Sequence, residues 1–112
     1  IHIATSKTLS ADEKRDLRAC TLRAVALLGK KPEHAMVRIE DGATLSRGAG
    51  DGECAFCDAR LLGAASREAC DAFAQALSAD LARIAQTAPQ CVYLSLSELA
   101  LCYTDGRLPP GH

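Results

Sequence analysis

The segment "LSADEKRDLRACTLRAVALLGKKP" (residues 9–32) decides the fold, because the second half of the chain repeats its pattern. Ser10 and Glu13 form a capping box, which is typical of a helix start. Gly29 and then Pro32 mark the helix end, since glycine suits a C-terminal cap and proline cannot continue a helix. The apolar face between these signals comprises Leu17, Thr21, Ala24, Val25 and Leu28. We therefore predict an amphipathic helix here.

Strands are predicted on both sides of this helix. The segment "IHIATS" (1–6) alternates apolar and polar residues, which is typical of a half-buried strand. After the proline, "HAMVRIED" (34–41) is also predicted to be a strand, with Val37 and Ile39 facing the core. The first part of the chain thus predicts a β-α-β unit.

The second half has the same order of elements. A strand at "CAFCDARLL" (54–62) precedes a helix that opens at Ser66, and the strand "CVYLSLS" (91–97) follows Pro89. The serine-to-proline spacing is 22 residues in the first half and 23 in the second. We therefore expect one domain over residues 1–112, built from pseudo-repeats at about 1–47 and 53–100. The predicted apolar face of the second helix comprises Ala69, Phe73, Ala76, Leu77, Leu81 and Ile84.

Two β-α-β units predict an α/β fold with a four-stranded sheet and both helices on one face, because crossovers are right-handed. The sheet face under the helices would carry Val37, Ile39, Val92, Leu94 and Leu96. The uncovered face would carry Arg38, Glu40, Asp58, Arg60, Tyr93 and Ser95. A polar uncovered face and unpaired strand edges favour assembly with further copies of the chain.

Composition limits the range of functions. Thirteen basic residues against fourteen acidic ones give a net charge of −1, which argues against nucleic acid as the main partner. No apolar run approaches the roughly 20 residues of a membrane span, and the first residues have no signal-peptide pattern. Six cysteines suggest a secreted disulfide framework, but Cys20 and Cys70 fall inside the predicted helices and the chain is large enough to need no disulfides, so we expect reduced thiols. We expect a cytoplasmic protein, with secretion without a signal peptide as the other possibility.

The Cys-x-x-Cys pair, Cys54 and Cys57, invites a metal or redox interpretation. Residues three apart in a strand face opposite sides and lie about 10 Å apart, whereas a disulfide needs Cα atoms within about 7 Å. A zinc site would need further ligands, and His2, His34 and His112 show no matching spacing. The pattern favours a structural role, and we predict no metal and no cofactor.

Three sequence motifs and their spacing resemble those of the tautomerase superfamily, and within it the macrophage migration inhibitory factor family. The motifs are "LLGKKPEHAMVRI", "CAFCDARLLG" and "CVYLSLSEL". The resemblance covers roughly residues 1–98 and implies a β-α-β-β-α-β protomer that assembles as a homotrimer. It also implies keto–enol tautomerisation of small α-keto acids such as phenylpyruvate, and some members are secreted cytokines.

The resemblance places the catalytic base, an N-terminal proline, two residues before Ile1. The Ile1 amine is a displaced and poorer substitute, so we expect little or no tautomerase activity from a chain that starts at Ile1. Lys30 matches the lysine that pairs with the substrate carboxylate. Its other interpretation is a helix-end lysine that complements the helix dipole.

The resemblance implies four substrate-binding residues. Leu62 matches a backbone N–H that binds substrate, or is simply a core residue at a strand end. Tyr93 matches a tyrosine contributed across the trimer interface, or is a half-buried strand residue. Ser95 stands where the family often has Asn, and Tyr103 is the candidate for an aromatic residue near the C-terminus.

Two segments depart from the family pattern. The Gly-Gly-Ser loop is here "RGAGDGE" (47–53), whose glycines are best interpreted as turn residues because a strand follows them. The C-terminal segment "CYTDGRLPPGH" (102–112) is shortened and altered, which leaves pocket shape and substrate choice open. Two functions therefore remain: a tautomerase for a small keto acid, or a catalytically weak, cytokine-like trimer that binds a ligand or a protein receptor.

Overall fold

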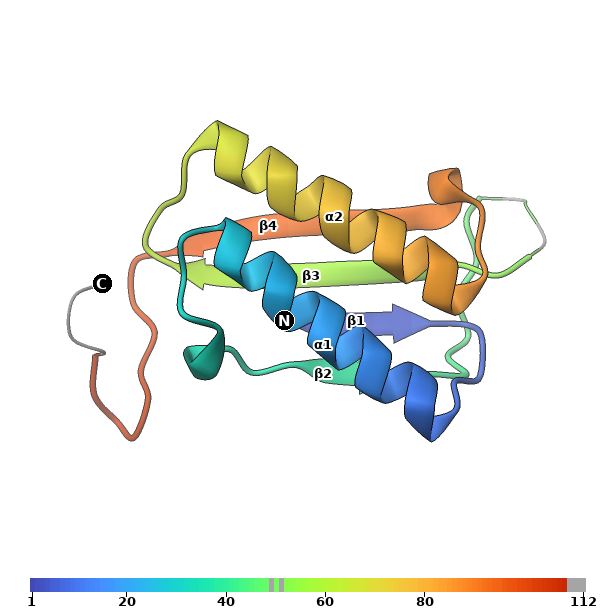
Figure 1. The fold of residues 1–112 in the computed structure, drawn as a ribbon, viewed down its shortest axis with the longest axis horizontal. Helices are drawn as coiled ribbons and strands as arrows, with labels where there is room; N and C mark the ends of the chain where they lie inside the picture. Colours follow the sequence, from blue (N-terminus) through green and yellow to red (C-terminus); the bar gives the residue numbers. More distant parts are fainter. Residues whose placement is uncertain (49, 51, 109–112) are drawn as a thin grey trace.

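The computed structural model describes residues 1–48, 50 and 52–108 and has two layers. A four-stranded sheet forms one layer, and two helices lie side by side across one of its faces (Figure 1). None of the described residues forms a helix on the other face of the sheet. The α/β architecture predicted from the sequence is therefore confirmed.

The first unit contains strand β1 (His2–Thr5), helix α1 (Ala11–Leu27) and strand β2 (Arg38–Glu40). Helix α1 starts as predicted, because the Ser10 side chain accepts a hydrogen bond from the Glu13 N–H and the Glu13 side chain accepts one from the Ser10 N–H. These bonds satisfy two amide groups that have no partner within the helix. The residues that α1 buries are Leu17, Cys20, Thr21, Ala24 and Val25.

The second unit contains strand β3 (Ala55–Leu62), helix α2 (Arg67–Ala85) and strand β4 (Val92–Leu99). Ser66 caps α2 by accepting a hydrogen bond from the Ala69 N–H. At the other end, Gln86 adopts a left-handed conformation with φ 54° and ends the helix. The residues that α2 buries are Phe73, Leu77, Leu81, Ile84 and Ala85.

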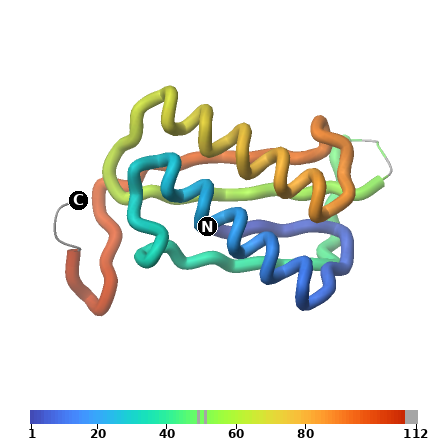
Figure 2. Tube along the Cα trace, in the orientation of Figure 1, coloured from blue at the N-terminus to red at the C-terminus, as the bar shows by residue number. Residues whose placement is uncertain are grey.

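The strand order is β2-β1-β3-β4. Each unit contributes a parallel pair, and β1 joins β3 antiparallel at the centre of the sheet. The trace in Figure 2 shows how the two units repeat the same path, with α1 and α2 running in opposite senses above their strands. This arrangement confirms the two predicted β-α-β repeats and leaves β2 and β4 as edge strands.

Strand β2 is shorter than predicted. We expected a strand over residues 34–41, whereas Pro32–His34 form a 3₁₀ turn and pairing with β1 spans only Arg38–Glu40. Proline suits the first position of such a turn because it lacks the N–H that a strand needs. Ile39 packs against the core as predicted, but Val37 lies before the strand, is only half-buried and stays outside the core cluster.

The core lies between the sheet and the helices. Its largest fully buried side chains include Phe73, Ile3, Leu17, Leu77 and Leu81. Val92, Leu94 and Leu96 are half-buried and pack against this core from β4. The core is therefore aliphatic, with Phe73 as its aromatic member.

The cysteines of the Cys-x-x-Cys pair occupy different positions. Cys57 lies on the core face of β3 and is 1% exposed, whereas Cys54 precedes the strand. Burial raises the pKa of the Cys57 thiol to about 12, so it stays protonated. All six cysteines are free. The predicted strand is confirmed, and Cys57 is a packing residue.

Candidate functional site

Lys30 lies at the end of the molecule where α1 and β3 finish. Gly29 has φ +73°, a left-handed conformation that lets the chain turn directly after the helix. The Lys30 ammonium then donates hydrogen bonds to the carbonyl oxygens of Leu62 at 3.0 Å and Ala64 at 3.1 Å. The structure thus brings Lys30 and Leu62 together, although they are 32 residues apart.

Gly63 allows Lys30 to bond to both carbonyl groups. Its φ of +80° turns the chain sharply at the end of β3, so that the carbonyls on either side point to one cation. A side chain at this position would be strained, because non-glycine residues rarely adopt that conformation. The ammonium has three N–H donors and uses two on these carbonyls, which leaves one for another acceptor.

Ile1 directly precedes β1, whose first residue is His2. The Ile1 nitrogen donates to the Met36 carbonyl at 2.7 Å, and the Ile1 carbonyl accepts from the Arg38 N–H at 2.8 Å. The antiparallel register pairs His2 with Asp58, which places Ile1 level with residue 59. Ile1 is therefore about 10 Å short of the level of Leu62, at ~3.3 Å per residue.

Tyr93 and Ser95 lie on the uncovered face, away from Lys30. Tyr93 pairs with Phe56, and Ser95 pairs with Asp58 and donates a hydrogen bond to it at 3.1 Å. Phe56 is six residues from Leu62 along β3, which corresponds to about 20 Å. The structure therefore separates Tyr93 from Lys30 within one chain.

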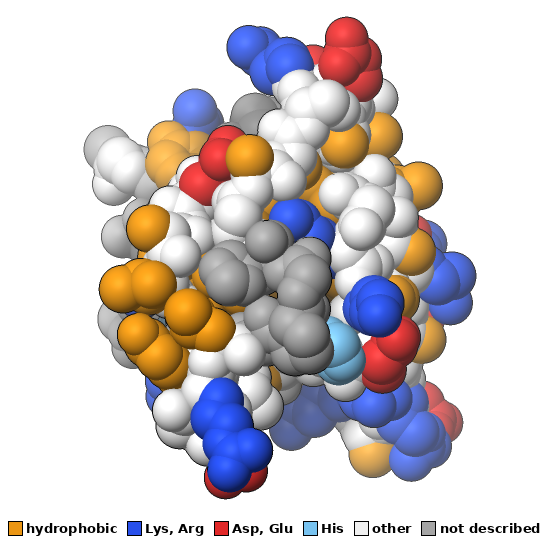
Figure 3. All heavy atoms as spheres, turned by 90° about the vertical axis from the view of Figure 1, so that its left-hand side faces the viewer, with side chains coloured by type: hydrophobic (Ala, Val, Ile, Leu, Met, Phe, Trp, Pro, Cys, Tyr) orange, Lys and Arg blue, Asp and Glu red, His pale blue; other side chains and the backbone are white. Residues whose placement is uncertain are grey.

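Tyr103 lies in the segment after β4 and is 57% exposed. A tight turn follows it, in which Thr104 and Arg107 exchange two backbone hydrogen bonds around Asp105 and Gly106. Figure 3 shows the end of the molecule toward which this segment extends, with hydrophobic side chains exposed on its surface. The exposed large hydrophobic residues of the chain include Met36, Leu101, Tyr103 and Leu108.

The uncovered sheet face is polar, as predicted, and its charged side chains form ion pairs with one another. Arg38 forms an ion pair with Glu40 on β2, and Arg60 lies 3.6 Å from Asp58 on β3. His2 lies between these pairs, 3.3 Å from Glu40 and edge-on to Phe56. Because each arginine has a carboxylate neighbour, this face offers no excess charge of one sign at these positions.

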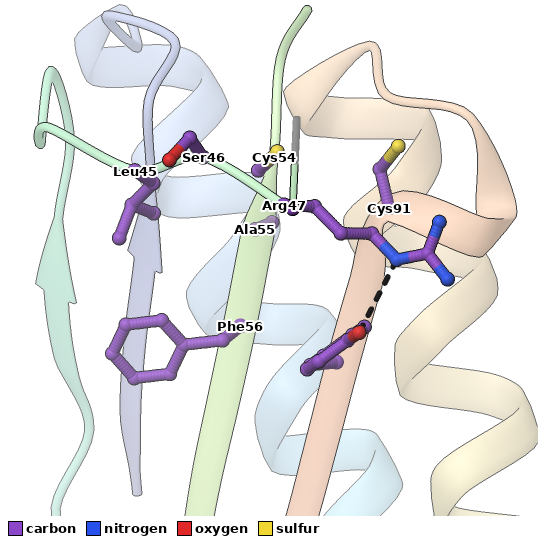
Figure 4. A pocket seen from close by; sticks show the side chains of 9 residues that line it. Leu45, Ser46, Arg47, Cys54, Ala55, Phe56 and Cys91 are labelled. Carbon is purple, nitrogen blue, oxygen red and sulfur yellow. Dashed lines mark hydrogen bonds between the residues drawn. The ribbon is translucent and has the colours of Figure 1, made fainter. Parts of the chain in front are cut away.

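Arg47 is a site residue that was not predicted from the sequence. Its Nε–H donates to the Tyr93 hydroxyl at 3.2 Å, and its guanidinium carbon lies 5.7 Å from the centre of the Tyr93 ring (Figure 4). The hydrogen bond to Tyr93 is the main reason why the pKa of Arg47 is held above its ordinary range. Nothing local in "RGAGDGE" indicates this contact, because the partners are 46 residues apart.

Two small cavities lie on the uncovered face. One of about 200 Å³ is lined in part by Arg47, Phe56 and Tyr93, and one of about 250 Å³ by Ile1, His2 and Arg60. Ligand sites commonly occupy about 300–1,000 Å³, so each is small for a complete site. Within the described residues, no three His, Cys, Asp or Glu side chains are grouped as metal ligands, and no helix there is long and apolar enough to cross a membrane.

Comparison with protein-family models gave no match, and neither did comparison with curated proteins. Solved structures do match. Leishmania major MIF2 is 14% identical, with a TM-score of 0.84 over 96% of this chain and 93% of that one. Pt0534 inactivated by 2-oxo-3-pentynoate is 18% identical, with a TM-score of 0.81 over 96% and 93% of the two chains.

A third structure extends the comparison to the fused 4-OT proteins. The fused 4-OT asymmetric trimer is 14% identical, with a TM-score of 0.73 over 96% of this chain and 95% of that one. The three matches each cover nearly the whole of both chains, and their TM-scores are those of one shared topology. The chain therefore has the fold of macrophage migration inhibitory factor and 4-OT, that of the tautomerase superfamily.

Proposed function

We propose that this protein is a tautomerase that interconverts the keto and enol forms of small α-keto acids such as phenylpyruvate. The observation that carries the proposal is the placement of Lys30 against the carbonyls of Leu62 and Ala64. A cation fixed beside a strand end, with one N–H donor left, suits the carboxylate of a keto acid. The structural match to Pt0534, which 2-oxo-3-pentynoate inactivates, supports the same class of ligand.

The register of the sheet supports the position of the base. In the β1–β3 pairing, each residue of β1 and its partner have numbers that sum to 60. A residue two positions before Ile1, continuing β1 in register, would therefore lie level with Leu61. That level adjoins Leu62 and the Lys30 ammonium. A proline amine placed there would be a secondary amine beside the cation that holds the substrate carboxylate.

In this mechanism the amine removes a proton from the carbon next to the keto group. Lys30 binds the carboxylate and keeps the substrate in place, and a nearby cation also favours the neutral, basic form of the amine. The Leu62 N–H helps to orient the substrate. Proton transfer needs the base within hydrogen-bonding reach of that carbon, and a misplacement of 1 Å costs about a hundredfold in rate.

The site also needs a second subunit. Tyr93 and Ser95 lie about 13–20 Å from the level of Leu62 along the sheet, so a homotrimer is the arrangement in which they reach Lys30 of a neighbour. The fused 4-OT match is itself a trimer, which supports this assembly. The small size of the cavities on the single chain also supports a site that is completed by a second subunit.

The test uses phenylpyruvate and three forms of the protein. With the chain starting at Ile1, we expect little or no enolisation, because the amine lies about 6–7 Å from the required position. A form with proline two residues before Ile1 should be active. In that form, Lys30→Ala should raise KM at least tenfold, because the loss of a charge-assisted hydrogen bond costs about 1.5–3 kcal/mol.

A matched control is Lys31→Ala, which removes the neighbouring lysine and should leave KM unchanged. Strong activity from the form starting at Ile1 would refute the role of the proline. A proline form without activity would favour the second function, a trimer that binds a ligand or protein receptor in a cytokine-like role. The altered segment after β4, where Tyr103 is 57% exposed, is the feature that favours this second function.

A further inference from the structure

Cys54 and Cys91 occupy equivalent positions at the entrance to neighbouring parallel strands. Ala55 pairs with Val92 at the start of the β3–β4 ladder, and each cysteine directly precedes its member of that pair. Cys91 is also the last residue of the 3₁₀ turn Pro89–Cys91 that leads into β4, and the strands that the two cysteines precede lie about 5 Å apart. Disulfides span Cα distances of about 4.4–6.8 Å, a range that suits residues on neighbouring strands and not two residues three positions apart along one strand, such as Cys54 and Cys57.

Both thiols also face the same space. The cavity that they line also contains Phe56 and Tyr93, whose side chains lie on the uncovered face of the sheet. Cys54 and Cys91 both line the cavity beside Tyr93, at the end of the sheet remote from Lys30 (Figure 4). Cys57 instead points into the core, where it is 1% exposed.

A cation accompanies the two thiols. Arg47 lines the same cavity, fixed there by its contacts with Tyr93. Tyr93 is the main cause of the raised pKa of Arg47, and Cys91 and Cys54 are among the further groups that contribute to it. A neighbouring guanidinium favours a thiolate, which is the reactive form of cysteine.

We propose that Cys54 and Cys91 form a modification site at which a hydroperoxide generates a reversible disulfide. Cys91 is the half-exposed member and meets the oxidant first, while Cys54 is only 8% exposed and acts as the resolving thiol. Reactive cysteines of this kind are accessible and stand beside a resolving cysteine. Arg47, which lines the same cavity, is the positioning residue.

The oxidation of the two thiols to a disulfide proceeds in two steps. The Cys91 thiolate attacks one peroxide oxygen, the O–O bond breaks, and a sulfenic acid forms as hydroxide leaves and takes up a proton. The Cys54 sulfur then attacks the Cys91 sulfur, the S–S bond forms, the S–O bond breaks, and a second water leaves. Two thiols are oxidised and one peroxide is reduced to two water molecules. A dithiol such as dithiothreitol reverses the change by thiol–disulfide exchange.

The experiment treats the full chain with hydrogen peroxide and maps its disulfides by peptide mass spectrometry. It uses a Cys102→Ser background, because Cys102 is exposed and could link two chains. We expect the Cys54–Cys91 pair to form first and to disappear with dithiothreitol. In Cys54→Ser, Cys91 should accumulate as a sulfenic acid that a cyclic 1,3-diketone traps, whereas in Cys91→Ser the remaining thiol should react at least tenfold more slowly.

Substitutions of Arg47 test whether this residue promotes the oxidation of Cys91 or merely lies near it. Arg47→Gln should slow Cys91 oxidation several-fold, whereas Arg47→Lys should restore most of the rate. Arg23→Gln, beside the buried Cys20, is the matched control and should leave the rate unchanged. A disulfide mapped between Cys54 and Cys57, or oxidation of Cys91 without any pairing to Cys54, would overturn the proposal.

Discussion

At the scale of single residues, the core depends on a few fully buried side chains. Cys57 illustrates this, because it is 1% exposed and packs in the cluster under the helices. Its raised pKa, about 12, follows first from burial, so the thiol behaves as a small apolar group. Cys57 belongs to a Cys-x-x-Cys pattern that invites a metal or redox interpretation, but its role in the structure is to pack in the core.

This role predicts the effect of substituting Cys57. Cys57→Ser should lower the free energy of unfolding by about 1–3 kcal/mol, because it places a hydroxyl without an assured partner in an apolar site. Cys57→Ala keeps the site apolar and should cost less than Cys57→Ser. Chemical denaturation of the two variants measures the difference. Equal stability of the Ser variant and the parent would contradict the packing role.

The thiol chemistry gives a second check at the same scale. In the native protein, Cys57 should react with a neutral alkylating reagent far more slowly than Cys102, because Cys57 is buried and protonated at pH 7 while Cys102 is exposed. Mass spectrometry of digested samples, taken over time, gives the two rates. Similar rates would show that β3 opens readily.

At the scale of elements, the ends of α1 are fixed by local chemistry. The Glu13 side chain accepts hydrogen bonds from the Ser10 N–H and from Lys7, and these two bonds, in that order, lower its pKa. The first turn of the helix therefore carries a carboxylate held by its neighbours. The favourable position of a negative charge at a helix N-terminus adds to this.

Two substitutions test the cap. Ser10→Ala should lower the free energy of unfolding by about 1 kcal/mol, because one helix N–H loses its partner. Ser10→Asp keeps an acceptor at the same position and should retain most of the stability. Thermal unfolding of both variants provides the comparison, and equal losses for Ala and Asp would contradict the capping role.

The lowered pKa of Glu13 also gives a pH dependence with a definite sign. Its folded pKa is below the unfolded value of about 4.3, so its stabilising contribution is complete above that pH. The contribution is lost as the pH falls through the lower folded pKa, since the unfolded chain takes up the proton first. Glu13→Gln should therefore flatten the acid side of the stability curve and leave the region above pH 7 almost parallel to the parent.

The elements also show what the sequence can and cannot predict. Both helices were predictable because caps and apolar faces are local features, as Ser10 and Ser66 demonstrate. Strand β2 was predicted too long because its limits depend on pairing with β1, which no local pattern encodes. The Arg47–Tyr93 contact and the neighbouring positions of Cys54 and Cys91 were missed for the same reason.

At the scale of the whole molecule, the sheet divides the proposed site into two parts. Lys30 lies beside the end of β3, while Tyr93 lies near its beginning, on the uncovered face. Edge strands β2 and β4 have unpaired backbone groups that another copy can satisfy. Light scattering at micromolar concentration should therefore report three times the 11.8 kDa chain mass, and a stable monomer would contradict the shared site.

A mixing experiment tests whether one site draws residues from two subunits. In the proline form, Lys30→Ala and Tyr93→Ala should each have low activity when purified alone, because every site of such a trimer lacks one of the two groups. Unfolding and refolding an equal mixture redistributes the subunits. A site between a Tyr93→Ala subunit, which supplies Lys30, and a Lys30→Ala subunit, which supplies Tyr93, then contains both native groups. Random assembly of a cyclic trimer makes about a quarter of the sites native, so activity should rise to about that fraction of the parent value. Refolding each variant separately before mixing is the control and should show no rise. If the co-refolded mixture also shows no rise although mixed trimers are present, Lys30 and Tyr93 do not share a site.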